Sequence, residues 1–537
     1  MNDKDQETTT RSSVGGSTTR RTALKTAGAL ALALGALDLA GHGKPAPVRL
    51  PLENAATVLP DIQFDIGAFI APVQTIAGVQ FHFGPVYTSL VTATLTRNPS
   101  KIEQHTLSQA IDEIECAYPF SASGVFVFLA YGLPYFNRLP GGVAGPLVSA
   151  HMPRLASATG RSVLEEAVPG PTDVSTANPQ IRKKTFNVPV RIETNDVLFT
   201  IRSDSLPNIL DVQAWLFGDS GSLNGRPVPS PVLNGLFHVT SDRLNFVQPG
   251  LPRDLADQFG FSFAHQVNPT SPMWMGFADQ QVHGSAPNGR TVTFLGTSTA
   301  RLTTAKLGDY FDDGAIQHLS HVIDDLAQFY DTAPTSAEPF SERVQYMFRS
   351  KKNDGTPGLP YPEDPNDPFT NGGGLGAPTG ATTAQEQSAF LETVFLGAND
   401  IATNFDPAVT GHHKYRVGHL PGLQRSSRAA DGTPLHIRMD GPGLSSLDVP
   451  DGSIQPTLEF TVFVPTAEFF RQMRVNAASL DYVKVGQQGG TATSVPPGDE
   501  AADSGDDGLE TFLTATRRQN FLIPPRRHRS FPLLELT

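Results

Sequence analysis

Short runs rich in Phe, Val and Ile recur between Gly, Pro and Asp residues, and they restrict the fold of this chain more than any other feature. Runs of this length and composition, bounded by turn-forming residues, are typical of β-strands. In the first part of the chain they read IQFDIGAFIAP, SGVFVFLAYGL, FNVPVRI, DVLFTIRSD and GLFHVTSD. The sequence therefore predicts several short strands in this part.

Amphipathic helices are predicted between these strands. The stretch TLSQAIDEIECAY places Leu107, Ile111, Ile114 and Cys116 near one face and acidic residues on the other. The stretch SLPNILDVQAWLFG has a similar pattern. Strands mixed with helices predict an α+β or α/β first half, from about residue 50 to 295.

A further helix is predicted for GDYFDDGAIQHLSHVIDDLAQFYD, residues 308–331. Its apolar stripe would consist of Ile316, Leu319, Val322, Ile323, Leu326 and Phe329. His318, His321 and Asp325 have spacings that could chelate a metal ion. Nothing else in the sequence converges on them, so we interpret them as part of a solvated polar face.

A loop and a second folded half follow. Residues 351–385 are dominated by Pro, Gly, Asn and Asp, and such a segment cannot bury enough apolar surface to fold alone. Its four acids lack the spacing of an EF-hand, so we interpret it as a surface insertion. After it, AQEQSAFLETVFLGAND and AEFFRQMRVNAASL are predicted helices, and TPLHIRMDG and LEFTVFVPT are predicted strands.

The N-terminus has the pattern of an export signal. Arg20 and Arg21 precede a modest apolar run over 27–40, which is too short to span a bilayer comfortably. We interpret residues 1–43 as a twin-arginine signal peptide, so the protein is expected to be secreted or to lie in the cell envelope. Export by this route carries folded proteins, often with a cofactor already inserted.

Charge and cysteine content exclude several classes of function. The formal net charge is −13, and no compact basic patch occurs before the C-terminal stretch, so nucleic-acid binding is not expected. That stretch, RRQNFLIPPRRHRSFPLLEL, interleaves basic and apolar residues as a closing strand and loop would. The single cysteine, Cys116, excludes an intrachain disulfide framework and Cys-ligated metal clusters. Any metal must be held by His, by carboxylates or by a macrocycle.

Two short stretches offer chemistry. MGFADQ ends an aromatic-rich run with one carboxylate, Asp279, which read alone is a residue that closes a turn. TPLHIRMDG contains His436 and, two residues later, Arg438. A single histidine in a strand is more often structural than a ligand, and an arginine there can be a surface cation.

Four segments, taken in their order along the chain, resemble the dye-decolorizing peroxidase superfamily of haem proteins. DVLFTIRSD resembles the strand D-L-L-x-H-I-R-x-D of the family's first half, and GFADQQ resembles its G-x-x-D-G motif. LHIRMDGPG is similar to the A-H-I-R segment that presents the axial haem ligand. LEFTVFVPTAEFFRQM is similar to the strand and helix that follow. The resemblance covers about residues 55–535 without the loop at 351–385.

The resemblance implies an α+β fold with two ferredoxin-like halves, each with a four-stranded antiparallel sheet. The N-terminal half would span 50–295, a helical and Gly/Pro-rich insertion 296–385, and a C-terminal half that binds haem b 386–537. His436 would ligate the iron. Arg438, on the same strand face, would bind a haem propionate. Family members often associate, so a homo-oligomer is also expected.

Asp279 takes the position of the distal carboxylate. In this role it would move a proton from one oxygen of hydrogen peroxide to the other. The chain departs from the family at two points: Gln280 replaces the last glycine of the motif, and the turn SSLDVPDGSIQPT lacks the arginine expected 18 to 20 residues after the axial histidine. Arg290, His283 and Gln280 are the nearest substitutes in sequence.

The sequence therefore predicts an exported haem-dependent oxidoreductase that uses peroxide to oxidise an organic reductant, with its peroxidase competence in question because of the missing arginine. The alternative is a non-catalytic secreted haem- or ligand-binding protein on the same scaffold.

Overall fold

The structure is a computed structural model. It describes residues 58–72, 74–76, 79–166, 190–231, 233, 235–267, 269, 271–275, 288–330, 429, 431, 433–470, 473 and 512–537. The leader, the loop at 351–385 and the predicted helix AQEQSAFLETVFLGAND lie outside these residues. The predicted helix AEFFRQMRVNAASL lies largely outside them.

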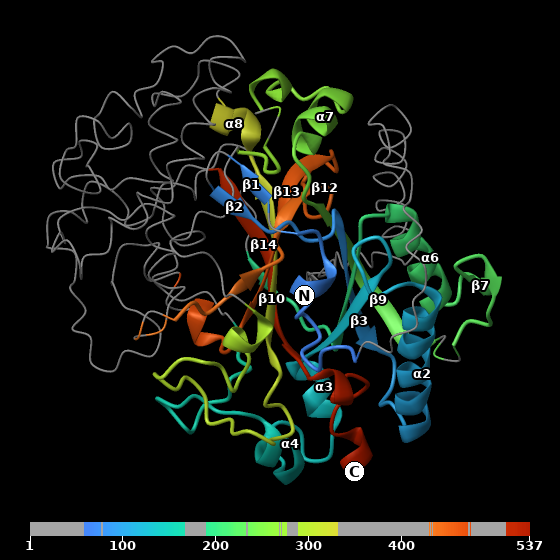
Figure 1. Cartoon of the computed structure of the whole chain (residues 1–537), viewed down its shortest axis with the longest axis vertical. Coiled ribbons are helices and arrows are strands. Elements are labelled where there is room, and N and C mark those ends of the chain that lie inside the picture. Colours follow the sequence, from blue (N-terminus) through green and yellow to red (C-terminus); the bar gives the residue numbers. More distant parts are fainter. Residues whose placement is uncertain are drawn as a thin grey trace, which may run out of the picture.

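Eight long strands form a closed, antiparallel barrel at the centre of the described part (Figure 1). The first four are β3 (Tyr87–Leu95), β4 (Phe126–Gly132), β6 (Val197–Ser203) and β9 (Phe237–Phe246). The second four are β10 (Ala315–Asp324), β12 (Gly441–Ser445), β13 (Gln455–Val464) and β14 (Leu513–Ile523). Around the barrel the order is β10-β13-β12-β9-β3-β6-β4-β14, and β14 also pairs with β10.

The remaining elements are short or lie outside the barrel wall. The strands are β1 (Gln74–Ile76), β2 (Val79–Phe81), β5 (Arg191–Ile192), β7 (Ser222–Leu223), β8 (Arg226–Pro227) and β11 (Ile437–Arg438). The α-helices are α2 (Lys101–Ala117), α3 (Leu133–Arg138), α4 (Pro146–His151), α6 (Leu206–Leu216), α7 (Leu251–Gln258) and α8 (Leu326–Tyr330). The 3-10 turns are η1 (Gly67–Phe69), η2 (Ala264–Gln266), η3 (Gly289–Val292), η5 (Arg526–His528) and η6 (Leu534–Leu536).

The two separate sheets expected from the resemblance are joined into one closed barrel. The first four strands lie in the order β9-β3-β6-β4 and the second four in the order β12-β13-β10-β14, which is the same order by position in the chain, read in the opposite direction. Each set forms an antiparallel sheet, as predicted. The two sheets are nevertheless joined at both ends, through Gly132 and Tyr131 of β4 against β14 and through a single pair, Asn245 and Gly443, between β9 and β12. Joining removes the open sheet edges.

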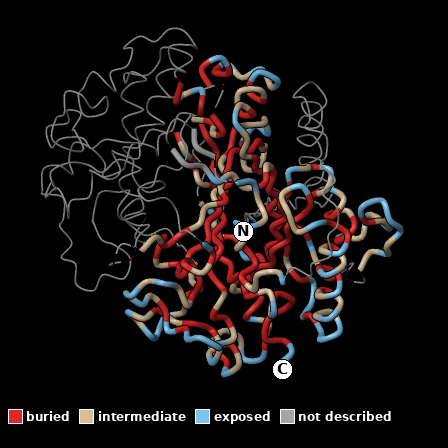
Figure 2. Tube along the Cα trace, in the orientation of Figure 1, coloured by how far each residue is buried: buried red, intermediate tan, exposed pale blue. Residues whose placement is uncertain are grey.

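The inside of the barrel holds an apolar cluster shared by both sets of strands. Leu90, Phe128, Leu319 and Phe463 are members of this cluster and come from four different strands. The ring of Phe64, which precedes the barrel in sequence, stacks on Phe463 at a centroid distance of 4.2 Å. Figure 2 shows that the barrel strands are largely buried, whereas the exposed residues lie on the surrounding helices and connecting segments. The N-terminal segment is therefore part of the barrel core.

The outer face of the first four strands is covered by α2 and α6. Helix α2 begins at a capping box in which Ser100 accepts from the Glu103 N–H and the Glu103 side chain accepts from the Ser100 N–H. Its side chains Ile111 and Ile114 are completely buried, whereas Cys116, expected near the same face, is exposed. Both helices and the predicted strands β4, β6, β9 and β13 are confirmed.

The helix predicted for residues 308–331 is wrong, because Ala315–Asp324 form strand β10 and only Leu326–Tyr330 are helical. Every residue of β10 is buried, since one face lies in the barrel and the other lies under further chain. A strand buried on both faces loses the alternation of polar and apolar residues that identifies strands in a sequence. His318 and His321 therefore do not form a solvated face: both are buried, on opposite sides of β10.

Two further strand predictions changed in the structure. IQFDIGAFIAP, residues 62–72, contains the 3-10 turn η1 and no strand. FNVPVRI contributes only the two residues of β5, and its residues 186–189 lie outside the described part. The C-terminal stretch does form a closing strand, β14, followed by a loop with two 3-10 turns.

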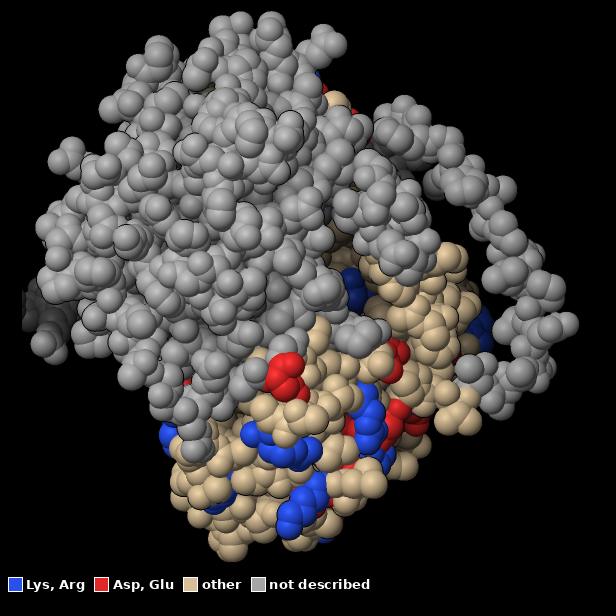
Figure 3. Space-filling view, turned by 60° about the vertical axis from the view of Figure 1, so that its left-hand side comes forward, with Lys and Arg blue, Asp and Glu red and all other residues tan. Residues whose placement is uncertain are grey.

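One face of the described part has a mixed charge. In the view of Figure 3, Lys and Arg side chains are interspersed with Asp and Glu on the part of the molecule that is not grey. No helix in the described part of the chain has the length and apolar character needed to cross a membrane.

Candidate functional site

His436 and Arg438 reach the outer face of the second four strands. They flank Ile437 in the segment of β11, which pairs with β13. Ile437 packs against the apolar cluster inside the barrel. Because side chains alternate along an extended chain, His436 and Arg438 point to the opposite, outer side. The His436 residue is completely buried and the Arg438 side chain is 17% exposed.

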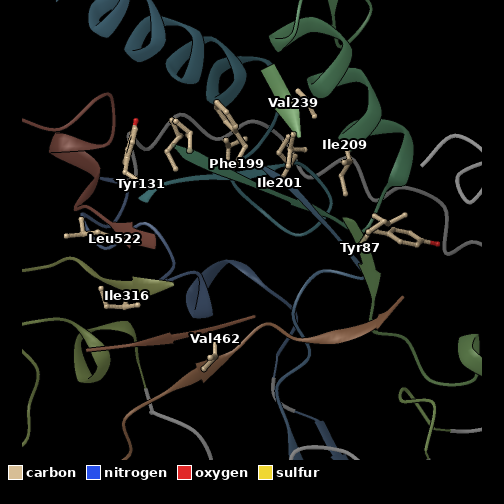
Figure 4. Packing of buried hydrophobic residues seen from close by; sticks show 14 of the residues in the cluster. Tyr87, Tyr131, Phe199, Ile201, Ile209, Val239, Ile316, Val462 and Leu522 are labelled. Atoms are coloured by element: carbon tan, nitrogen blue, oxygen red, sulfur yellow. The ribbon is translucent and has the colours of Figure 1, made fainter. Parts of the chain in front are cut away.

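Pairing across the sheet extends this face into a row. Arg438 is in register with Val462 of β13, and Val462 with His318 of β10. His318 is in turn in register with Asn520 of β14. Because neighbouring strands lie about 4.8 Å apart, the backbones of Arg438 and His318 are roughly 10 Å apart on one face. Figure 4 shows Ile316, Val462 and Leu522, which supply the apolar part of this side of the barrel.

His318 is held by hydrogen bonds at both ring nitrogens. Its Nδ1 lies 2.7 Å from Asn520 Oδ1, and its Nε2 lies 2.6 Å from Ser320 Oγ. The Asn520 amide donates to the backbone oxygen of Glu165, and the Asn520 N–H donates to Glu166 Oε2 over 3.1 Å. Burial, and to a lesser degree the charge of Glu193, raises the pKa of Glu166 to about 7 although the Asn520 bond lowers it.

Two phenylalanines from the segment after β13 cover this row. The Phe469 ring lies 5.8 Å from the His436 ring, and the Phe470 ring stacks on His318 at 4.0 Å, measured between centroids. Phe469 and Phe470 contact each other edge to face at 5.0 Å. The two histidines are therefore parts of one aromatic-lined region, which comes from β10, β11 and the residues after β13.

Asp279 lies outside the described residues, but the stretch that leads to it is anchored near this face. Trp274 is buried, and its Nε1 donates to the Gly443 oxygen of β12 over 3.2 Å. The Tyr330 hydroxyl of α8 donates to the Trp274 oxygen over 2.7 Å. Trp274, which precedes MGFADQ, is thus hydrogen-bonded to β12, and β12 pairs with β13 as β11 does.

The turn expected to carry a distal arginine contains Asp448, 12 residues after His436 and before the expected position. Asp448 accepts from Arg517 Nε over 2.6 Å and from Arg191 Nη2 over 3.0 Å. Although burial alone would raise the pKa of Asp448, the hydrogen bonds and charge of Arg517 lower it to about 2. Arg517 also contacts Glu193, with 3.3 Å between Nη1 and Oε1. This arginine is therefore committed to two carboxylates.

Of the three proposed substitutes for the missing arginine, only Arg290 lies in the described part of the chain. Arg290 donates to Asp313 Oδ1 over 3.0 Å, on η3. Gln280 and His283 lie outside the described residues. None of the three is placed by the described contacts beside His436.

A small hollow opens next to the segment that leads into β11. Leu435, Pro465, Leu302 and Phe294 are among the residues that line it. Its empty volume is about 240 Å³ even with the part that is open to solvent. Pockets that bury a drug-sized ligand measure about 300–1,000 Å³, so this hollow is not a site for a macrocycle.

The donor set on the outer face fits a haem in its chemistry. A buried imidazole among aromatic and aliphatic side chains is the usual axial ligand of haem iron. A guanidinium on the same face matches the geometry of a propionate carboxylate. Among the described residues no group of three or more His, Cys, Asp and Glu side chains could hold a bare metal ion.

Comparison with known proteins gives two kinds of similarity. A family of unknown function (DUF7405) matches residues 165–357, a little over a third of the chain. This match includes β6, α6, β9 and β10. No curated protein sequence matches the chain.

Among solved structures the chain is similar to dye-decolorizing peroxidases. A putative DyP-type peroxidase from Shewanella oneidensis matches with a TM-score of 0.42 and 13% identity, over 84% of this chain and 95% of that one. The enzyme from Bacteroides thetaiotaomicron matches with 0.41 and 12%, over 88% and 99%. A Rhodococcus jostii DypB variant in complex with haem matches with 0.41 and 12%, over 83% and 94%. At these identities and TM-scores, the side chains of this chain must carry any statement about its function.

Sequence reasoning missed His318, Ser320 and Asn520 as members of this face. The sequence showed His318 only as one of three residues with metal-chelating spacing on a predicted helix, because a strand that is buried on both faces lacks the alternation that identifies strands. Asn520 lies more than 200 residues away from His318 in sequence, so only the pairing of β10 with β14 brings the two together.

Proposed function

We propose that the protein is an exported haem-dependent oxidoreductase that uses hydrogen peroxide to oxidise an organic substrate. Export by the twin-arginine route follows from the sequence of residues 1–43, and secretion or a place in the cell envelope follows from that route. Haem b would be bound mainly by the C-terminal half. The scaffold is that implied by the family resemblance, with two ferredoxin-like halves closed into one barrel.

The observation that carries the proposal is the shared outward face of His436 and Arg438. A completely buried imidazole beside aromatic rings, with a guanidinium two residues along the same face, supplies an axial ligand and a propionate partner at once.

Three residues have assigned roles. A bound haem would supply the iron through which hydrogen peroxide, the oxidant, oxidises the substrate. His436 would bind that iron and orient the macrocycle, and Arg438 would fix a propionate. Asp279 would hold and move a proton between the two peroxide oxygens, which general acid–base groups accelerate by about 100- to 10,000-fold.

Haem binding is tested by absorption spectroscopy of the purified protein expressed with ample haem. The wild type should show a Soret band, and His436→Ala should weaken or abolish it. His238→Ala, which changes an exposed histidine of β9, is the matched control and should leave the band unchanged. A colourless wild type, or an unchanged band in His436→Ala, would contradict the proposal.

A second candidate function is a secreted haem- or ligand-binding protein without peroxidase activity. It is favoured by the turn at 445–457, which contains no arginine and in which Asp448 accepts from Arg517 and Arg191. If the haem-loaded protein shows no spectral change with peroxide, and Asp279→Asn behaves like the wild type, this second function replaces the first.

A further inference from the structure

One buried arginine of the described part lacks the anionic partner that the other buried arginines have. Arg202, Arg243 and Arg529 are each at most 8% exposed. Arg243 is paired with Glu193, and Arg529 is paired with two acids of α2. Arg202 forms no ion pair within the part of the chain that the structure describes. A charged group that has left water is costly to the folded state unless an opposite charge and hydrogen bonds replace its hydration.

Arg202 lies on the inner face of β6, at the end of the barrel where β4 begins. It alternates with Ile201, which packs on the outer side of the same strand. Arg202 is in register with Thr88 of β3 and with Phe126 of β4. Phe126 belongs to the apolar cluster inside the barrel, and the Phe120 ring contacts it edge to face at 4.7 Å. Arg202 is thus flanked by a hydroxyl on one side and by aromatic rings on the other.

The guanidinium of Arg202 has one edge in use and one edge open. Its Nε donates to Thr88 Oγ1 over 3.0 Å, which fixes the plane of the group. Neither Nη nitrogen has a hydrogen-bond partner in the described part of the chain. Unlike Nη1 of Arg243 and Nη2 of Arg526, which also lack partners, neither Nη of Arg202 is fully enclosed. The two Nη groups therefore present a fork of N–H donors, the geometry that binds both oxygens of a carboxylate.

Gly84 keeps the space beside this fork free of a side chain. A Cβ at Gly84 would lie 2.6 Å from Nη2 and 3.6 Å from Nη1 of Arg202, so any other residue would crowd the open edge. Two residues further on, the Val86 N–H donates to Asp204 Oδ1 over 3.0 Å. This hydrogen bond holds the segment that precedes β3 against the end of β6. Gly84 and Arg202 thus form two sides of one small site.

The charges around the fork favour an anion with a single negative charge. Burial lowers the pKa of Arg202 to about 10, although the charge of Asp204 raises it, so the guanidinium is charged at neutral pH. Asp204 forms no ion pair with Arg202. One cation, partly offset by this acid, balances one negative charge better than two. The aromatic ring of Phe126 offers an apolar surface to the rest of such a ligand.

We propose that the end of the barrel at Arg202 is a binding site for a small organic monocarboxylate. Both carboxylate oxygens accept from Nη1 and Nη2 of Arg202, and the apolar part of the ligand lies toward Phe126. The site does not depend on haem, because Arg202 faces the inside of the barrel whereas His436 and Arg438 face the outside. Arg202 and Asp204 belong to the stretch DVLFTIRSD, which thereby has a role besides forming strand β6.

The first test is urea unfolding of the wild type at pH 7 in sodium acetate, sodium chloride or sodium phosphate of equal ionic strength. Acetate should raise the urea midpoint in a saturable manner relative to chloride, because a ligand that binds only the folded state stabilises it. Phosphate should raise it less. If acetate has no more effect than chloride, the site is overturned. If phosphate is as effective as acetate, the assignment to a monocarboxylate is overturned.

The second test repeats the acetate titration with variants. Arg202→Met should abolish the acetate effect, and Arg202→Lys, which keeps the charge but not the fork, should weaken binding about tenfold or more. Gly84→Ala should also weaken it, in a variant that retains the arginine. Arg226→Met, at an exposed arginine of β8, is the matched control and should respond as the wild type does. A wild-type response in Arg202→Met or in Gly84→Ala would overturn the site.

The third test separates this site from the proposed haem site. The acetate effect should be the same for protein purified with and without haem. If loading with haem abolishes it, Arg202 holds a haem propionate, and the separate carboxylate site is overturned. A wild type that responds to acetate but shows no Soret band would support the carboxylate site and contradict the proposed function alone.

Discussion

The outer faces of the two half-barrels differ, although their strands follow the same order. On the first half, aliphatic and aromatic side chains of β4 and β6 pack under α2 and α6, as Figure 4 shows for Phe199, Ile201 and Ile209. On the second half, Arg438, His318 and Asn520 stand in one row across the strands. The strand order therefore does not determine where a site forms. The side chains on each face determine it.

The polar groups on the first face illustrate the difference. Asp242 of β9 accepts from Ser89 Oγ over 2.7 Å and from the Gln213 amide of α6 over 3.2 Å. Burial raises the pKa of Asp242 to about 6. These hydrogen bonds connect β9 to its neighbour β3 and to the covering helix α6. The first face thus uses polar residues for packing, whereas the second presents titratable groups beside an aromatic region.

Among the variants that test this comparison, Phe199→Ala is expected to lower the free energy of unfolding most. Phe199 is completely buried on the first face and contacts Phe217 and Phe237 edge to face at 5.4 and 5.2 Å. Truncation of such a ring costs about 3–5 kcal/mol of unfolding free energy, because it leaves a cavity under the helices. Urea unfolding measures the loss. Phe460→Ala, at a partly buried phenylalanine of the second half, should cost clearly less. Equal losses would show that the two faces are packed alike.

A pH-dependent effect is expected from Glu166→Gln. The pKa of Glu166 is raised from its usual 4.5 to about 7 by burial, so the folded state binds the proton more tightly than the unfolded state. The unfolding free energy contributed by this group is therefore fully present below about pH 4.5 and is lost as the pH rises through 7, by at most about 3 kcal/mol. Glu166→Gln should flatten the stability profile between pH 5 and 8, measured by urea unfolding.

Asp242→Asn provides the counterpart on the first half. Its raised pKa of about 6 has the same sign, so its stabilising contribution should disappear over a lower pH window, from about 4 to 6. If both variants keep the wild-type pH profile, neither acid is protonated in the folded protein at these pH values.

A smaller loss of unfolding free energy is expected from Gly443→Ala. Gly443 lies where β12 pairs with β9 and joins the two halves of the barrel. A Cβ at Gly443 would lie 2.7 Å from Thr457 Oγ1 and 2.9 Å from the Leu244 oxygen, and the latter is backbone that cannot move cheaply. Overpacking of this kind costs about 1–3 kcal/mol. Gly452→Ala is not an equivalent control, because Gly452 has a φ of +71°. Gly221→Ala, where a Cβ meets nothing within 4 Å, should be near neutral. Wild-type stability in Gly443→Ala would mean that β9 and β12 can move apart around residue 443 without loss of unfolding free energy.

Much of the local structure could be predicted from the sequence. The helices α2 and α6 and the strands β4, β6, β9 and β13 follow from periodicity, composition and turn residues. The spacing of His436 and Arg438 also predicts their common face, since an extended chain alternates its side chains. The residues assigned by resemblance in MGFADQ stay a prediction, because Asp279 lies outside the described residues.

Only the tertiary structure decided how the halves are joined and which residues share the candidate site. Closure of the barrel depends on pairing between β4 and β14 and between β9 and β12, over distances in sequence that no local pattern records. The same long-range pairing buries β10 on both faces, which hides its strand periodicity, and it places His318 in line with Arg438 and Asn520. A sequence determines the side chains of a strand, but the register between distant strands determines which of those side chains meet.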